Sequence, residues 1–132
     1  MRVVLDTSAA MDIVLHAPGA ERFSKALEEA EWIEVPDLYI AEAANVCWKR
    51  HRIGEFGLKH IETALEQALV LPNAFVPAIE LYQEAFSLAI ASQRAVYDMF
   101  FLALARRRGA TLFSTDKGLL AFAAKHDVKT LK

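Results

Sequence analysis

Alternation of short strand-like runs with longer helix-like segments is the feature of this sequence that most constrains its fold. The strand-like runs are rich in apolar and β-branched residues, and the segments between them carry apolar residues at helical spacing. The predicted strands are residues 2–5, 33–35, 73–76, 110–113 and 128–130, and the predicted helices are residues 8–15, 19–30, 37–52, 55–70, 77–93, 96–108 and 117–125. Such alternation favours an α/β fold in which helices cover both faces of a parallel sheet.

Two of the strand-like runs, RVVL at 2–5 and ATLF at 110–113, are nearly continuous in apolar or β-branched residues and are predicted to be interior strands. A chain of 132 residues with 55% hydrophobic residues fits one domain with a substantial core. No apolar stretch reaches the roughly 18 to 20 residues that cross a bilayer, so no membrane segment is expected. The single cysteine, Cys47, is expected to be a core residue in a reducing cytoplasm.

The charge pattern gives no global signal for nucleic acid, because the formal net charge is −2. Basic residues nevertheless gather at 49–52 (KRHR) and 106–108 (RRR), at the ends of two predicted helices. The helix macrodipole favours cations there, and a rim that binds phosphate is the alternative interpretation. The histidines show no metal-ligand spacing, so zinc is not expected; they are His16, His51, His60 and His126.

Two acidic residues follow predicted strands and precede predicted helices. Asp6 stands in VVLDTSAA, where Ser8 is well placed to cap a helix that begins at Ala9. Asp116 stands in TLFSTDKGLL, where it can cap a helix that begins at Lys117. Capping alone does not explain why two strands of one parallel sheet end in the same way. Ligands of such sheets bind outside the carboxyl ends of the strands, so the two acids are expected to converge there.

Two further acids interrupt apolar helix faces. Glu42 lies between Leu38 and Val46 at helical spacing, and a carboxylate on a core-facing stripe needs a cation or a pairing partner. An ordinary salt bridge is one alternative there. Asp98 shares a face with apolar residues of the helix predicted at 96–108, although an acid near a helix N-terminus is also favourable for electrostatic reasons alone.

The segments that carry these acids resemble the PIN domain, in particular the VapC-type toxins of prokaryotic toxin–antitoxin pairs. The resemblance covers essentially the whole chain and is most specific in P-x-L-x-x-x-E-x-x-N and in Y-D-x-x-F-L-A-L-A followed by L-x-S-T-D. It implies a single domain over residues 1–132, a three-layer α/β/α sandwich with a mostly parallel sheet of about five strands. It also implies a cytoplasmic Mg²⁺- or Mn²⁺-dependent endoribonuclease that a co-encoded antitoxin inhibits. A homodimer is expected as well.

The resemblance also assigns site residues. The family's acidic cluster falls on Asp6, Glu42, Asp98 and Asp116, as catalytic residues and metal ligands. Supporting polar residues fall on Thr7, Ser8, Asn45, Ser114 and Thr115. Residues 54–76 carry little of the family pattern.

Hard divalent cations fit such a site, because Mg²⁺ and Mn²⁺ prefer carboxylate and water oxygens. A metal held by Asp6, Asp98 and Asp116 would activate a water for attack on phosphorus. Glu42 would hold a second metal or orient the water, and the sequence does not choose between these schemes. An antitoxin helix with an apolar face is expected to lie against residues 22–30 and 43–51, with a cation directed toward the carboxylates.

Three competing classes remain at this point. A phospho-accepting receiver domain normally has an acidic pair after its first strand and an acceptor Asp at mid-chain, and neither is evident. A phosphohydrolase with an Asp nucleophile would have a second acid where Ser8 stands. The third class is a catalytically silent PIN-fold module that binds RNA or protein, and the presence of all four acids argues against it.

Overall fold

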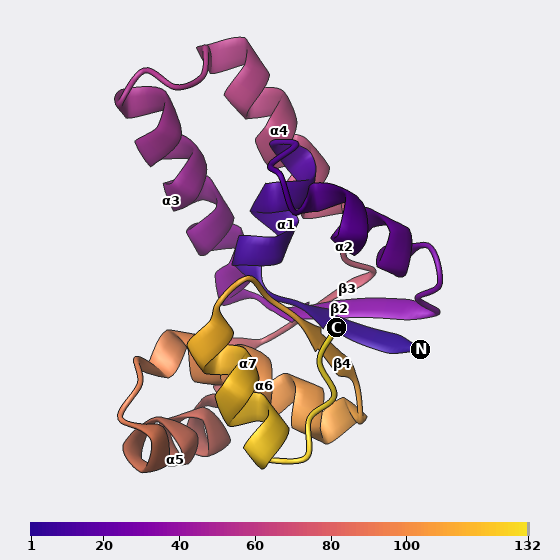
Figure 1. Ribbon diagram of the computed structural model, residues 1–132. Helices are drawn as coiled ribbons and strands as arrows, with labels where there is room; N and C mark the ends of the chain where they lie inside the picture. The colour runs from indigo at the N-terminus through magenta and orange to yellow at the C-terminus, as the bar shows by residue number, and fades with distance from the viewer. Residues whose placement is uncertain (132) are drawn as a thin grey trace.

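A parallel sheet between two groups of helices forms the centre of the molecule (Figure 1). The computed structural model describes residues 1–131. Within them the sheet consists of β1 (Arg2–Leu5), β2 (Trp32–Pro36), β3 (Ala74–Val76) and β4 (Thr111–Phe113), in the order β3-β2-β1-β4. Every pair of neighbouring strands is parallel, which confirms the predicted α/β class.

The helices cover the two faces of this sheet. One group comprises α1 (Thr7–Val14), α2 (Ala20–Leu27), α3 (Leu38–Arg52) and α4 (Leu58–Val70), of which α3 and α4 form a hairpin that extends from the body in Figure 1. The other group comprises α5 (Tyr82–Ser92), α6 (Val96–Arg108) and α7 (Lys117–Lys125). Among residues 1–131, no single helix has both the length and the apolar character to cross a bilayer.

Three predicted elements differ from the structure. The helix predicted at 77–93 divides into a short 3-10 helix, η1 (Ala78–Glu80), and α5, because the fully buried Leu81 anchors the joint in the core. The strand predicted at 128–130 makes only one bridge, between Leu112 and Thr130, so the sheet within residues 1–131 has four strands instead of five. The run at 110–113 is therefore not interior: β1 and β2 occupy the inner positions, and the 128–130 segment borders β4.

The main core lies between the sheet and α6. Residues Phe101 to Ala105 of α6 are almost fully buried, and the rings of Phe23 and Phe113 stack 6.0 Å apart across the sheet. A second cluster fills the space between α1, α3 and α4, and it includes Cys47, whose predicted place in the core is confirmed. These two clusters fix β1, β4, α3 and α6, the elements that carry the candidate site.

Candidate active site

The carboxyl ends of β1 and β4 lie side by side. Leu5 pairs with Phe113, and the amide of Asp6 donates to the carbonyl of Phe113 at 2.9 Å. The next residues, Asp6 and Ser114, therefore leave the sheet together. The prediction that the acids following these two strands lie at one edge of the sheet agrees with this register.

Asp6 is the most enclosed acid of the site, with 6% of its surface exposed. Its Oδ2 accepts hydrogen bonds from Ser8 Oγ at 2.8 Å and from Ser114 Oγ at 2.7 Å. Burial raises the pKa of the Asp6 carboxyl, the two hydroxyl donors oppose that effect, and the charge of Asp98 adds to it. The position expected for Ser8 is wrong: α1 begins at Thr7, with Asp6 at the N-cap position, so the Ser8 hydroxyl serves Asp6 and not the helix end.

Glu42 comes to the same place from α3. Its Oε1 accepts a hydrogen bond of 2.8 Å from Thr7 Oγ1, which follows Asp6 directly. Burial raises the pKa of the Glu42 carboxyl, and the charges of Asp6 and Asp98 raise it further. Among residues 1–131 Glu42 enters no salt bridge, so the ordinary ion pair considered from the sequence is not what holds it.

Asp98 and Asp116 share a cation that the sequence did not reveal. Arg94 Nη2 lies 2.6 Å from Asp116 Oδ2 and 3.2 Å from Asp98 Oδ2. The spacing of four between Arg94 and Asp98 was the only available signal, and it is weak because Arg94 precedes α6. Asp116 also caps α7 as predicted, since its Oδ1 accepts from the amide of Leu119 at 3.0 Å.

The remaining supporting residues contribute unequally. Ser114 Oγ accepts from the amide of Asp116 at 3.0 Å while it donates to Asp6, so it connects two of the acids. Thr115 takes part through its backbone, whose amide donates to Ser8 Oγ at 3.1 Å. Asn45 is exposed on α3, one turn beyond Glu42. The structure therefore brings Thr7, Ser8 and Ser114 to the carboxylates through their side chains, and neither Thr115 nor Asn45 in this way.

The donor set determines which metal fits. Carboxylate and hydroxyl oxygens are the ligands that Mg²⁺ and Mn²⁺ prefer. Within residues 1–131, however, no three His, Cys, Asp or Glu side chains stand close enough together to hold an ion as they are. The Arg94 guanidinium occupies the position of a cation between Asp98 and Asp116. The residues fit a hard divalent cation in kind, and the carboxylates must draw closer to coordinate one.

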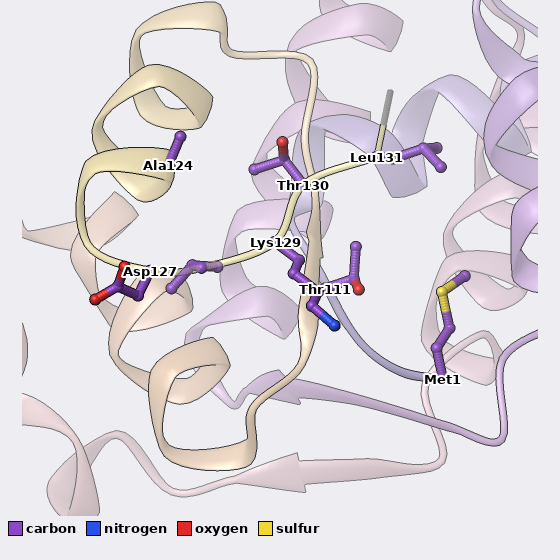
Figure 2. Close-up of a pocket in the computed structure, with 8 residues that line it drawn as sticks. Met1, Thr111, Ala124, Asp127, Lys129, Thr130 and Leu131 are labelled. Carbon is purple, nitrogen blue, oxygen red and sulfur yellow. The ribbon is translucent and has the colours of Figure 1, made fainter.

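Other candidate features lie elsewhere. Figure 2 shows a hollow at the opposite end of the sheet, where Met1 and Thr111 lie near Lys129 and Leu131. The basic residues at 106–108 are engaged structurally, since Arg108 Nε lies 2.9 Å from Glu34 Oε2 and Arg106 and Arg107 pair with Glu84. The macrodipole and these ion pairs account for that cluster, which leaves residues 49–52 as the remaining candidate for a basic rim.

Comparison with known proteins agrees with this geometry. The family model of the PIN domain matches residues 3–125. The chain belongs to the PIN-domain family. Over 121 residues it is 29% identical to Ribonuclease VapC3 of Pyrobaculum aerophilum, which covers 90% of this chain and 92% of that protein.

Two solved structures share the fold of this PIN domain. The crystal structure of PAE2754 from Pyrobaculum aerophilum superposes with a TM-score of 0.75 at 22% identity, over 99% of this chain and 84% of that one. The crystal structure of FitAcB from Neisseria gonorrhoeae gives a TM-score of 0.66 at 20% identity, over 98% of this chain and 96% of that one. These likenesses support the architecture described above.

Proposed function

We propose that this PIN domain is a Mg²⁺- or Mn²⁺-dependent endoribonuclease, the toxin of a VapBC-type toxin–antitoxin pair. The observation that carries the proposal is the convergence of Asp6, Glu42, Asp98 and Asp116 from β1, α3, α6 and the end of β4. The similarity to a protein named Ribonuclease VapC3 supports RNA as the substrate. The chain is proposed to act in the cytoplasm.

The residues that would hold the ion are Asp6, Asp98 and Asp116, with Glu42 as a further ligand or a base. When bound, the metal supplies an activated water and offsets the charge that builds on the phosphoryl oxygens. Ser8 and Ser114 fix the orientation of the Asp6 carboxylate through the two hydrogen bonds to Oδ2. Thr7 does the same for Glu42, whose raised pKa suits a group that accepts a proton from water near neutral pH.

An antitoxin is the proposed protein partner. Side chains with apolar surface are exposed on α3, where Ile40 is 43% and Trp48 is 56% exposed. A second hollow lies between the α1–α2 turn and α4, lined by residues that include His16, Glu21 and Val70. An amphipathic helix would bury its apolar face against these elements and direct a cation toward the carboxylates. A homodimer is retained as part of the proposal.

The catalytically silent module is the second candidate, and one observation favours it. Arg94 already neutralises Asp98 and Asp116, which is an arrangement that needs no metal. Cleavage of RNA decides between the two candidates.

The test is incubation of a mixed RNA substrate with purified protein and Mn²⁺, with and without chelator. We expect cleavage only with metal, products with a 5′-phosphate and a 3′-hydroxyl, and loss of cleavage in Asp6→Asn. Far-UV circular dichroism of Asp6→Asn should match wild type, because the change is nearly isosteric. Cleavage at the wild-type rate by Asp6→Asn would refute the proposed function, and absence of cleavage by wild type under all metals would favour the silent module.

A further inference from the structure

Arg94 has a place built for it beside the candidate site. Gln93, the residue before it, adopts a left-handed conformation with φ of 58° at the end of α5, which turns the chain toward the carboxylates. The amide of Arg94 donates to Ser92 Oγ at 3.1 Å. The backbone therefore delivers the side chain to Asp98 and Asp116, and the contact is not the chance result of a long surface side chain.

Gly118 makes room for the Arg94 guanidinium. A Cβ atom at Gly118 would lie 2.5 Å from Arg94 Nη1 and 3.5 Å from Cζ. Glycine is unfavourable within a helix, and Gly118 stands in the first turn of α7 without a positive φ that would require it. The absence of a side chain at 118 is explained by the guanidinium that lies over it.

The guanidinium is nevertheless incompletely satisfied. Arg94 Nε is buried and has no hydrogen-bond partner among the described residues. Both of the listed contacts to carboxylates are made by the single nitrogen Nη2, at 2.6 Å and 3.2 Å. A planar guanidinium can give a carboxylate two parallel hydrogen bonds, and this one gives neither acid such a pair. The ion pairs are thus close in distance but weak in geometry, which suits a contact that another cation can replace.

We infer that Arg94 is the internal counter-ion of the metal-free site and competes with the divalent cation for Asp98 and Asp116. This inference rests on the proposed function, because it takes these two acids as metal ligands. Two cations cannot share the same carboxylate oxygens, so the guanidinium leaves Asp116 when the metal binds. The apparent affinity for metal is then lowered by the fraction of molecules in which Arg94 occupies the acids.

The experiment is titration of the full chain with Mn²⁺ by isothermal calorimetry, for wild type, Arg94→Gln and a matched control. The control is Arg107→Gln, which removes the same charge from the far end of α6, where Arg107 pairs with Glu84 at 3.5 Å. If Arg94 occupies the acids about nine-tenths of the time, Arg94→Gln should bind Mn²⁺ about tenfold more tightly than wild type. Arg107→Gln should bind as wild type does.

Removal of a nearby charge would also strengthen metal binding without direct competition, so two further measurements separate these causes. Gly118→Ala leaves every charge in place and displaces the guanidinium, and it should tighten Mn²⁺ binding in the wild-type background but not in the Arg94→Gln background. The Nε–H signal of Arg94, assigned by its absence in Arg94→Gln, should shift or broaden in NMR spectra when Mg²⁺ saturates the protein.

The outcomes distinguish this inference from the proposed function. If wild type binds Mn²⁺, Arg94→Gln binds it equally well and the Arg94 signal ignores Mg²⁺, competition is refuted while the metal site stands. If Arg94→Gln tightens binding but Gly118→Ala and the NMR signal do not respond, the effect is remote electrostatics and competition is again refuted. If neither wild type nor Arg94→Gln binds Mn²⁺, both the inference and the proposed metal site fall.

Discussion

Removal of the buried charge at Asp6 should stabilise the protein while it abolishes cleavage. In Asp6→Asn, the amide oxygen can still accept hydrogen bonds from Ser8 and Ser114, which lie 2.8 Å and 2.7 Å from Asp6 Oδ2. What the change removes is a carboxylate that burial and the charge of Asp98 make unfavourable, as the raised pKa of Asp6 indicates. Each unit of such a rise costs about 1.4 kcal/mol above the folded-state pKa.

The expected gain for metal-free Asp6→Asn is therefore about 1–2 kcal/mol at pH 7.5, or about 5 °C in Tm for a domain of this size. Because the pKa of Asp6 is raised in the folded state, its favourable contribution is fully present below the unfolded pKa of about 3.9 and is lost as pH rises through the folded pKa. The difference between Asp6→Asn and wild type should thus be small at pH 4 and full at pH 7.5.

The assay is urea unfolding in chelator at both pH values, with Glu66→Gln as control because it removes one exposed charge from α4. A stabilisation of Asp6→Asn that does not depend on pH, or a loss of stability at pH 7.5, would contradict this reasoning. Asp6 is the informative position because Asp98 and Asp116 already have Arg94 as a counter-ion.

Three further changes follow from single contacts. Ser114→Ala leaves Asp6 Oδ2 with one hydroxyl donor and the amide of Asp116 without its acceptor, so urea unfolding should show a loss of about 1.5–3 kcal/mol, with reduced cleavage; wild-type cleavage would exclude a positioning role. Tyr39→Phe removes a buried hydrogen bond of 2.6 Å to the Ala68 carbonyl and should cost about 1 kcal/mol without change in cleavage per folded molecule, which a parallel activity assay checks. Glu34→Gln weakens the buried acceptor of Arg2, Trp32 and Arg108 and should lower stability by about 1–3 kcal/mol, and an unchanged Tm would show that these partly exposed pairs contribute little.

The parts of the fold that depend on local pattern could be predicted. The apolar run RVVL and the helical spacing after 96 read directly as β1 and α6, because burial on both sides of an inner strand and of a core helix leaves a strong apolar signal. The 128–130 segment carries similar residues, yet it makes only one bridge. Whether an outer segment extends a ladder depends on tertiary geometry that its own few residues do not encode.

The acids of the site were visible because each stands against its background, at a strand end or on an apolar helix face. Arg94 was not visible, since its approach depends on the left-handed Gln93 and on the space above Gly118, two features contributed by separate segments. The place of Ser8 was wrong for a related reason. A serine at this point suits an N-cap by propensity, but the register between β1 and β4 brings Asp6 and Ser114 together and recruits the hydroxyl to Asp6.

The exposed apolar residues of the α3–α4 hairpin were also outside what the pattern could assign. Ile53 and Leu58 are 68% and 58% exposed at the tip of this hairpin, in the part of the chain where the family pattern is faint. An apolar spacing in a sequence does not distinguish a residue that packs within its own chain from one that remains available to a partner. The structure makes that distinction for α3, and it supports the choice of this helix as a wall of the antitoxin site.

The most direct test of the central claim is a crystal structure of the protein with Mn²⁺, analysed by anomalous scattering at the manganese edge. The account predicts an anomalous peak in coordination contact with carboxylate oxygens of Asp6 and of at least one of Asp98 and Asp116, with the Arg94 guanidinium withdrawn from Asp116. Saturating Mn²⁺ with no anomalous peak at these carboxylates, and Arg94 still paired with Asp98 and Asp116, would contradict the claim that the four acids form a metal site.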